Sequence, residues 1–278
     1  MKVNKNNKRG SKAFTLIELL VVISVIALLA ATVFNSLRGI RESARISNAL
    51  TFQSQMHSLL GADLVGWWNF DDSANRYGDL SGGGNTGTCT APGCPAPVDG
   101  VPGTRGTAMS FDGVDDVVRV PHSASLNITG AITVGAWIRR NVVDRRDDII
   151  RKTGEGYNVN IQPNVNLNRV LFQAQDSGGT WRTVWSNPNA VVNTEWHHVA
   201  VSYERPTARF YVNGQPWGTA IRDFDMRSSS SELTIGSFSS LFFSGTIDDV
   251  RIYSRALTAF EIQTLYAETR DKYLVEEK

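Results

Sequence analysis

Residues 195–218 read EWHHVAVSYERPTARFYVNGQPWG and carry the clearest β pattern of the chain. Apolar and polar side chains alternate in two runs, one on each side of the segment Glu204–Thr207. Such alternation is typical of strands that bury one face. Asn213-Gly214 supplies residues that accept the positive φ angles of a tight hairpin. The stretch therefore predicts antiparallel strands joined by short turns.

The same alternation occurs elsewhere between residue 64 and the carboxy-terminal end. Residues 131–140, AITVGAWIRR, place Ile132 and Val134 on one face of a strand and Thr133 and Trp137 on the other. Further strands are predicted at Ala108–Phe111, Val117–Val120, Val170–Gln175, Leu233–Ile235 and Thr246–Tyr253. Roughly a dozen short strands exceed a simple seven-stranded sandwich. We therefore expect a mainly β fold, an antiparallel sandwich of two sheets.

A different pattern occupies the amino-terminal end, where residues 13–34 form an apolar run of membrane-spanning length. Glu18 is its only charged residue, and a carboxylate in hydrocarbon costs several kcal/mol unless a partner neutralises it. A cut between Ala13 and Phe14 would make Phe14 the first residue and Glu18 the fifth, one helical turn away on the same face. The run therefore predicts a processed chain in which a new ammonium group, its own or a neighbour's, is the partner of Glu18.

Residues 14–18, FTLIE, preceded by a short basic leader, resemble the processing signal of type IV pilins and of the pseudopilins of type II secretion systems. The resemblance implies a prepilin peptidase that removes the leader on the cytoplasmic side and methylates the new amino terminus. It also implies that Glu18 promotes docking among other pilin or pseudopilin subunits. The family usually has Gly before the cut, where this chain has Ala13. A cut after Gly10 would make Glu18 the eighth residue, so a cut after Ala13 is preferred.

A secretory signal peptide and a plain membrane anchor are the alternatives for this segment. The leader carries five lysines and arginines and no acidic residue, which suits every alternative and places the amino terminus in the cytoplasm. The apolar run is longer than the roughly 7 to 15 residues of a signal peptide, and a plain anchor has no use for Glu18. We therefore expect a single-pass inner-membrane protein whose carboxy-terminal domain lies outside the cytoplasm, at the cell surface or in a periplasmic filament after assembly.

Several strings of the β region resemble the laminin G-like, or concanavalin A-like, jelly roll in its bacterial form. They are LVGWWNFDD (64–72), AMSFDGVDDVVRVP (108–121), VGAWIRR (134–140), WHHVAVSY (196–203), FYVNGQ (210–215) and GTIDDVRIYSRALTAFEIQTLY (245–266). In the last string, Thr258 and Glu261 form a capping box, and Leu257 and Ile262 form the hydrophobic staple of a short closing helix. The resemblance implies a jelly roll that could bind a glycan or a surface protein.

These patterns divide the chain into five parts. The helix that begins in the membrane is expected to continue to about Leu60, before Gly61, as the half-buried helix of pilin-like proteins does. The parts are a cleaved leader (1–13), a transmembrane assembly helix (14–34), its extracytoplasmic extension (35–62), the jelly roll (63–267) and a charged tail (268–278).

The sequence does not predict an enzyme. Glucanases of the resembling fold place paired carboxylates on one strand as E-x-D-x-x-E, and this string is absent. Asp248 and Asp249 are adjacent, so we expect them on opposite faces of a strand, and Asp115-Asp116 follow Gly113 in an expected hairpin turn. Neither pair suits an acid and nucleophile dyad.

The sequence does not predict a zinc site, but calcium is a candidate. Adjacent His197 and His198 are expected on opposite faces of one strand, so they cannot chelate one zinc ion together. Similar jelly rolls often hold a structural Ca²⁺, which is therefore a candidate cofactor here. Its candidate oxygen ligands are Asp71, Asp72, Asp112 and Asp248.

The two cysteines, Cys89 and Cys94, are spaced as CTAPGC in a loop rich in Pro and Gly. A turn can bring such a pair within disulfide distance, and an extracytoplasmic location favours oxidation. We therefore predict a bridge that closes a small loop within the insertion at 82–106.

Net charge argues against a nucleic-acid partner. The full chain has a formal charge of +1, and loss of the five leader cations leaves 23 Lys and Arg against 27 Asp and Glu, or −4. Nucleic-acid binding requires clustered cations, and the sequence shows no run of them. Trp181, Trp185 and Trp217 are candidates for stacking on sugar rings, although Trp in a sandwich also packs in cores.

Three functions follow from these patterns. The favoured one is a pilin-like or pseudopilin-like subunit that displays a jelly roll for glycan or protein binding and adhesion. The alternatives are a membrane-tethered carbohydrate-active enzyme and a secretion pseudopilin whose jelly roll is only a structural head. The expected partners are the prepilin peptidase, other pilin subunits and the inner membrane.

Overall fold

The structure is a computed structural model that describes residues 16–17, 19–27, 29, 60–101, 106–163, 167–238 and 241–271. Contacts divide the chain into two units, residues 1–57 and 58–278. The described residues of the first unit are helical, and their apolar side chains are exposed. No helix among the described residues is both long and apolar enough to cross a membrane. Ala13, Phe14, Glu18 and most of the predicted long helix lie outside the described residues.

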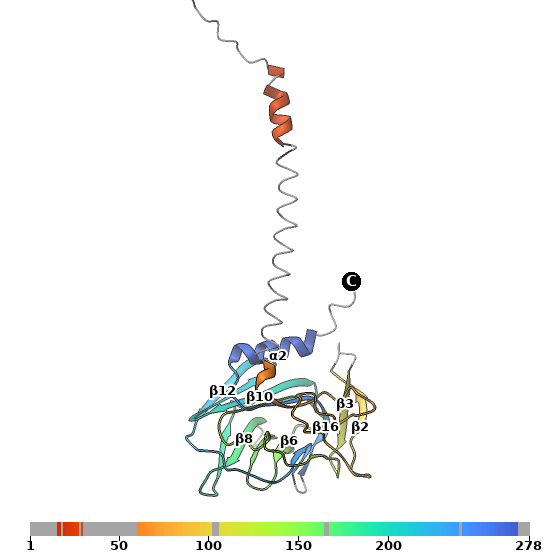
Figure 1. The fold of residues 1–278 in the computed structure, drawn as a ribbon, viewed down its shortest axis with the longest axis vertical. Helices are drawn as coiled ribbons and strands as arrows, with labels where there is room; N and C mark the ends of the chain where they lie inside the picture. Colours follow the sequence, from red (N-terminus) through yellow and green to blue (C-terminus); the bar gives the residue numbers. More distant parts are fainter. Residues whose placement is uncertain are drawn as a thin grey trace, which may run out of the picture. The chain divides into compact units, whose positions relative to one another are not determined.

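The second unit is a sandwich of two antiparallel sheets (Figure 1). The eight-stranded sheet has the order β12 (Gln215–Ile221), β11 (Thr207–Val212), β10 (Trp196–Glu204), β5 (Ile132–Arg140), β16 (Ser244–Tyr253), β3 (Thr107–Asp112) and β2 (Ala96–Asp99), and β1 (Leu64–Trp68) also pairs with β16. The six-stranded sheet has the order β4 (Val118–Val120), β13 (Leu233–Ile235), β6 (Asp147–Lys152), β7 (Tyr157–Gln162), β8 (Arg169–Gln175) and β9 (Trp181–Trp185). A small hairpin of β14 (Ser237–Phe238) and β15 (Leu241–Phe242) and the helix α2 (Ala259–Asp271) complete the described elements.

The predicted strands form because their apolar faces meet between the sheets. Val134 and Ile138 of β5, Val199 and Val201 of β10 and Phe172 of β8 belong to one buried cluster that fills the space between the sheets. The expected sandwich is therefore confirmed.

The hairpin predicted at Asn213-Gly214 is also confirmed. Val212 pairs with Gln215 across the turn, and Asn213 and Gly214 have φ angles of 50° and 72°. Asn and Gly are the residues that enter this region at least cost, so local chemistry fixes the pairing of β11 with β12 next to the turn.

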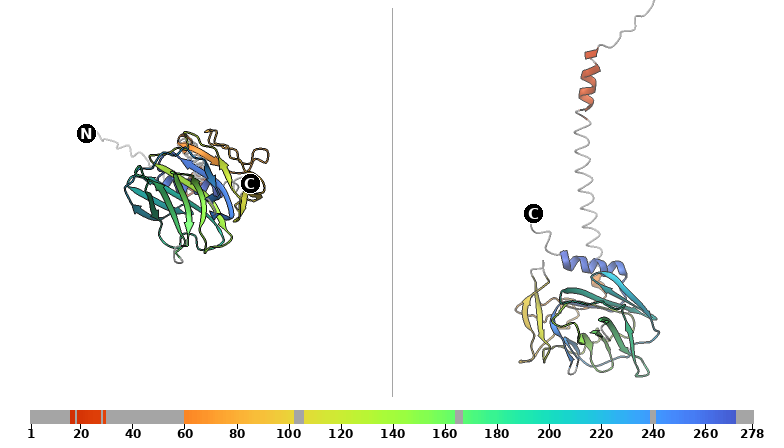
Figure 2. Two further views of the ribbon diagram at one scale, coloured as in Figure 1. Left: turned by 90° about the horizontal axis from the view of Figure 1, so that it is seen from below. Right: turned by 180° about the vertical axis from the view of Figure 1, so that it is seen from behind.

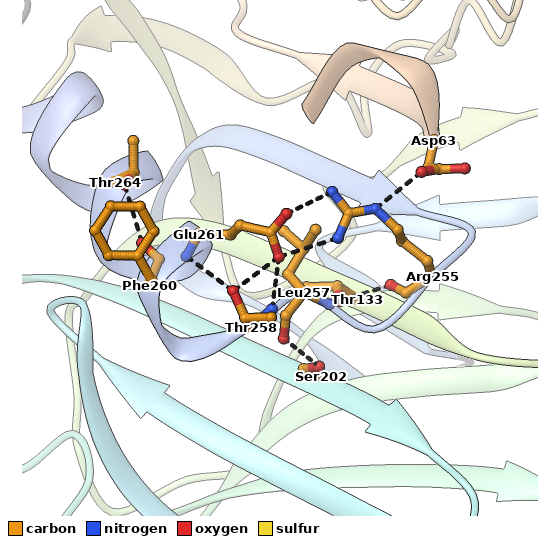
Figure 3. Close-up of polar contacts among 9 residues, drawn as sticks. All are labelled: Asp63, Thr133, Ser202, Arg255, Leu257, Thr258, Phe260, Glu261 and Thr264. Carbon is orange, nitrogen blue, oxygen red and sulfur yellow. Dashed lines mark hydrogen bonds and ion pairs between the residues drawn. The ribbon is translucent and has the colours of Figure 1, made fainter. Parts of the chain in front are cut away.

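Helix α2 covers the outer face of the eight-stranded sheet (Figures 1 and 2). Its capping box is formed, since the Thr258 N–H donates to Glu261 Oε2 at 2.8 Å and the Glu261 N–H donates back to Thr258 Oγ1 at 3.3 Å. Arg255 holds this helix start to Asp63, donating to Asp63 Oδ2 at 2.8 Å and to both carboxylate oxygens of Glu261 (Figure 3). Leu257 and the helical turn at Leu60 lie in the same small buried cluster. The chain therefore enters the β domain beside α2.

Candidate functional site

The outer face of the six-stranded sheet carries an unbroken row of polar side chains. Residues that lie directly opposite each other on paired strands share one face of a sheet. From β4 to β9, the residues opposite each other in this row are Arg119, Thr234, Arg151, Asn158, Gln173 and Thr183. The alternating residues of these strands, such as Val159 and Phe172, lie in the core, so the polar row faces away from the core. We call this surface the polar face. The sheet that carries it lies on the side of the sandwich away from α2 (Figure 1).

Side-chain hydrogen bonds connect the strands along the polar face. The Asn160 amide donates to Asn158 Oδ1 at 3.0 Å, and the Asn158 amide donates to Gln173 Oε1 at 3.3 Å. Gln173 in turn donates to Thr183 Oγ1 at 2.9 Å. Asn158 and Asn160 are fully buried, while Gln173 and Thr183 are half-buried. Hydrogen bonds therefore hold these side chains in place. They are buried on β7 and become partly exposed on β8 and β9.

Two tryptophans lie on the same face of the edge strand β9. Trp181 is directly opposite Gln175, and Trp185 is directly opposite Leu171, in line with Asn160 and Asp148. The four-residue spacing on an extended strand places the Cα atoms of the two tryptophans about 13 Å apart. Both are half-buried. The guanidinium of Arg151 stacks on Trp181 at 5.0 Å from the ring centre, which fixes that indole above the amides.

Arginines outnumber carboxylates on the polar face. Arg119 pairs with Glu232, and Arg146 pairs with Asp148 at 2.9 Å. Burial raises the pKa of Asp148 in spite of the Arg146 partner. Burial also lowers the pKa of Arg151, to about 10, which leaves it charged at neutral pH. With Arg169, the face therefore holds four cations against two anions.

Asn160, Arg169 and Gln175 of the polar face each have a buried atom without a hydrogen-bond partner among the described residues. These atoms are Asn160 Oδ1, Arg169 Nε and Gln175 Oε1. Buried polar atoms in native proteins are almost always paired, and an unpaired one costs about 1–3 kcal/mol. The polar face thus offers two acceptors and one donor beside two indoles. A ligand with hydroxyl groups can pair with the acceptors and the donor, and its apolar ring face can stack on the indoles.

The sequence alone identified part of this site. Trp181 and Trp185 were expected as sugar-stacking candidates, and both lie on the polar face. Trp217 does not: it lies on β12 of the other sheet, its indole N–H donates to the Pro188 carbonyl at 3.1 Å, and it packs against the core. The amides and arginines were missed. The signal was present as polar residues at every second position of YNVNIQ and, apart from Leu171, of RVLFQAQ. Strands β6 to β9 pair in chain order, but the alignment of these amides with Arg119 and Thr234 needs β4 and β13 beside β6, out of chain order.

A second group of polar residues lies on the opposite side, beneath α2. His198 is enclosed by Trp137, at 5.5 Å between ring centres, and by Tyr266 of α2, at 6.0 Å. Its Nδ1 has no hydrogen-bond partner among the described residues and it lines a cavity of about 10 Å³. Burial lowers the pKa of His198 to about 4, so the ring is neutral. His197 lies on the other face of the unbroken β10–β5 ladder, as expected.

The prediction that Asp248 and Asp249 point to opposite faces is wrong. Asp248 is opposite Trp137 and Arg251 is opposite Gly135, so a bulge between them interrupts the alternation. Asp249 has a φ of 45°, and its carboxylate accepts hydrogen bonds from Trp67 Nε1 at 2.6 Å and Arg251 Nε at 3.1 Å. Burial, and then the charge of Asp249, raises the pKa of Asp248 to about 8. Asp249 thus lies beneath α2, where it lines the same cavity as His198, while Asp248 is buried beside Gly100.

The four candidate calcium ligands are not brought to one place. Asp112 is opposite Ser244, whereas Asp248 is four residues further along β16, about 13 Å away. Asp112 instead groups with Asp115 and Asp116, whose carboxylate oxygens lie within 4.8 Å of its own. Asp71 accepts the Thr107 N–H at 2.7 Å and Asp72 accepts the Ala74 N–H at 2.9 Å. Calcium binding stays a prediction without a shared ligand set.

The predicted disulfide is present. Cys89 and Cys94 are bonded, with 5.2 Å between their Cα atoms. The loop that they close packs on the next part of the chain, since the Val117 N–H donates to the Gly93 carbonyl at 3.2 Å. The bridge therefore lies in the connection between β1 and β2.

Comparison with solved structures shows the same fold at low sequence identity. The binding domain of Paraclostridial Mosquitocidal Protein 1 is 17% identical, with a TM-score of 0.59 over 76% of this chain and 53% of that one. Domain 4 of AbnA, a GH43 extracellular arabinanase from Geobacillus stearothermophilus solved with arabinotriose, is 20% identical, with a TM-score of 0.58 over 73% and 98%. The botulinum neurotoxin serotype G binding domain is 16% identical, with a TM-score of 0.58 over 74% and 51%. This chain thus spans about half of each toxin domain.

Family comparisons match both parts of the chain. No curated protein sequence matches it. Residues 8–34 match the prokaryotic N-terminal methylation motif, a stretch that includes Ala13, Phe14 and Glu18. Residues 112–263, more than half of the chain, match the model of the concanavalin A-like lectin/glucanases superfamily. On this match and on its two-sheet fold, the chain belongs to the concanavalin A-like lectin/glucanases superfamily.

Proposed function

We propose that this protein is a pilin-like subunit that displays its jelly roll outside the cytoplasm as a glycan-binding head. A prepilin peptidase cuts between Ala13 and Phe14, and the amino-terminal helix inserts in the inner membrane and packs against other subunits. The observation that carries the proposal is the presence, in one chain, of the methylation motif at 8–34 and a jelly roll with two half-buried indoles on a polar sheet face.

The position of the polar face supports a display role. The chain enters the β domain at Leu60–Ala62, beside α2, and the six-stranded sheet is on the opposite side of the sandwich (Figure 1). The entry point is therefore on the side of the sandwich away from β9, which carries Trp181 and Trp185. The structural neighbours support binding over catalysis, because two of them are described as binding domains and the third, a domain of an arabinanase, was solved with arabinotriose.

Assembly is tested by removing the charge of Glu18. In Glu18→Gln, we expect the subunit to reach the membrane but to be absent from sheared filaments, because the carboxylate no longer pairs with an ammonium group. Glu42→Gln, beyond the apolar run, is the matched control and is expected to assemble. Wild-type amounts of the Glu18→Gln subunit in filaments would contradict the assembly role.

Glycan binding is tested on a panel of neutral and acidic oligosaccharides with the purified full-length chain. Trp181→Ala and Trp185→Ala are each expected to weaken binding about tenfold, since an aromatic stack contributes up to about 1.5 kcal/mol. Trp217→Ala, which removes the candidate indole that lies off the polar face, is expected to bind as the wild type does. Equal binding by all three variants would exclude the polar face as the site.

A further inference from the structure

Each indole of β9 has an arginine beside it. Arg151 stacks on Trp181, and Arg169 lies near Trp185. Gln175 is directly opposite Trp181, and Arg169 precedes Leu171, the residue opposite Trp185, by two positions on the same face. A diagonal neighbour of this kind is about 7–8 Å away, within reach of one ligand.

Arg169 differs from the other arginines of the polar face in its partners. Arg119 has Glu232, Arg146 has Asp148, and Arg151 stacks on Trp181. Among the described residues, no carboxylate pairs with Arg169, and its Nε is buried without a hydrogen-bond acceptor. The residue as a whole is half-buried. A buried N–H without an acceptor is unfavourable, so a ligand that supplies an acceptor to the Arg169 guanidinium would be stabilised there.

The remaining unpaired atoms define the rest of the ligand. Asn160 Oδ1 lies in the row of Trp185 and Gln175 Oε1 lies opposite Trp181. Both are acceptors, so they match hydroxyl or amide N–H donors. The indoles match the apolar faces of sugar rings. A carboxylate is the acceptor whose geometry and charge suit the guanidinium fork.

From this arrangement we infer that the polar face binds an acidic oligosaccharide, with a sugar ring on Trp185 whose carboxylate pairs with Arg169. The inference rests on the proposed glycan-binding function and adds the chemical class and the residue that selects it. The excess of arginines over carboxylates on this face favours an anionic ligand over a neutral one at long range as well.

The test compares acidic sugars with the same sugars after the carboxylate charge has been removed. The full-length chain, purified in detergent, is titrated with an oligogalacturonate and with sialyllactose, and with the carboxyl methyl ester of each. Arg169→Gln removes the selecting charge. Arg119→Gln is the matched control, because it lies on the same face but on β4, at the other edge of the sheet, and already has Glu232 as its partner.

We expect at least one acidic sugar to bind more tightly than its neutral counterpart by about ten- to a hundred-fold, the range of a charge-assisted hydrogen bond. Arg169→Gln should abolish that difference while leaving neutral binding unchanged, which also shows that the variant is folded. Arg119→Gln should retain the difference.

Two other results overturn the inference in distinguishable ways. If each acid and its neutral counterpart bind equally and both need Trp185, glycan binding stands and acid selection is wrong. If no member of the panel binds, the acidic-sugar inference and the glycan-binding proposal both fail. Retention of the acid preference in Arg169→Gln would remove Arg169 as the selecting residue.

Discussion

The stability of the β domain should depend on pH through His198. In the folded protein burial lowers the pKa of this imidazole to about 4, from an ordinary value of 6.5. The unfolded chain therefore binds a proton as the pH falls through 6.5, while the folded domain stays neutral at this position until about pH 4. The contribution of neutral His198 to the free energy of unfolding is therefore complete above pH 6.5, and it is lost as the pH decreases toward 4. The two pKa values correspond to a loss of about 3 kcal/mol.

The assay is urea unfolding between pH 7.5 and 4.5, followed by tryptophan fluorescence, which reports the β domain because the first tryptophan of the chain is Trp67. Asp248 also makes stability depend on pH in this window, with the opposite sign, because its pKa is raised from 3.8 to about 8 in the folded protein. The informative quantity is therefore the difference between the wild type and His198→Gln. Between pH 7.5 and 4.5, the free energy of unfolding of His198→Gln should not show most of the decrease of about 3 kcal/mol that His198 causes in the wild type. His122→Gln, at an exposed histidine, is the control and should follow the wild type.

The result that refutes this reasoning is equal pH dependence in the wild type and in His198→Gln. The same conclusion would follow if His122→Gln removed the fall, because the titrating histidine would then be a surface residue. If His198→Gln is destabilised by the same amount at every pH, the result does not support the prediction. Only the slope of the unfolding free energy against pH depends on proton binding by His198.

Three further predictions follow from local geometry. Thr258→Ala should destabilise the domain by about 1 kcal/mol through loss of the α2 cap, whereas Thr264→Ala on the same helix should not, and a cost shared equally by both would contradict the capping role. Gly245→Ala should prevent folding, because a Cβ would lie 2.1 Å from a backbone oxygen at a φ of 147°, while Gly130→Ala, which meets nothing within 4 Å, should express as soluble wild type. Reduction of Cys89–Cys94 should lower the free energy of unfolding by about 2 kcal/mol in urea, and an unchanged midpoint would show that the loop is held by other contacts.

The sequence predicted those elements whose cause is local. Asn213-Gly214 sets its own hairpin because both residues accept positive φ, and Thr258 with Glu261 caps its own helix. The apolar alternation of β5 and β10 specified which faces enter the core. These features depend on neighbours in the chain, so they can be read without the fold.

Features that depend on distant partners could not be predicted. The bulge at Asp249 exists where Trp67 and Arg251 receive its carboxylate, and the alternation rule gave the wrong face there. The polar row also needs strands in the order β4, β13, β6, β7, which the chain does not follow. The burial of His198 needs α2, and no pattern around WHHVA shows that a helix covers it.

The central claim is that this chain becomes a pilin-like subunit carrying a jelly-roll head, and mass spectrometry of the mature amino terminus tests it most directly. The protein should be extracted from the membranes of cells that contain the matching prepilin peptidase. The account predicts a first peptide that begins with N-methylated Phe14. A mature chain that still begins at Met1 and keeps its basic leader would contradict it.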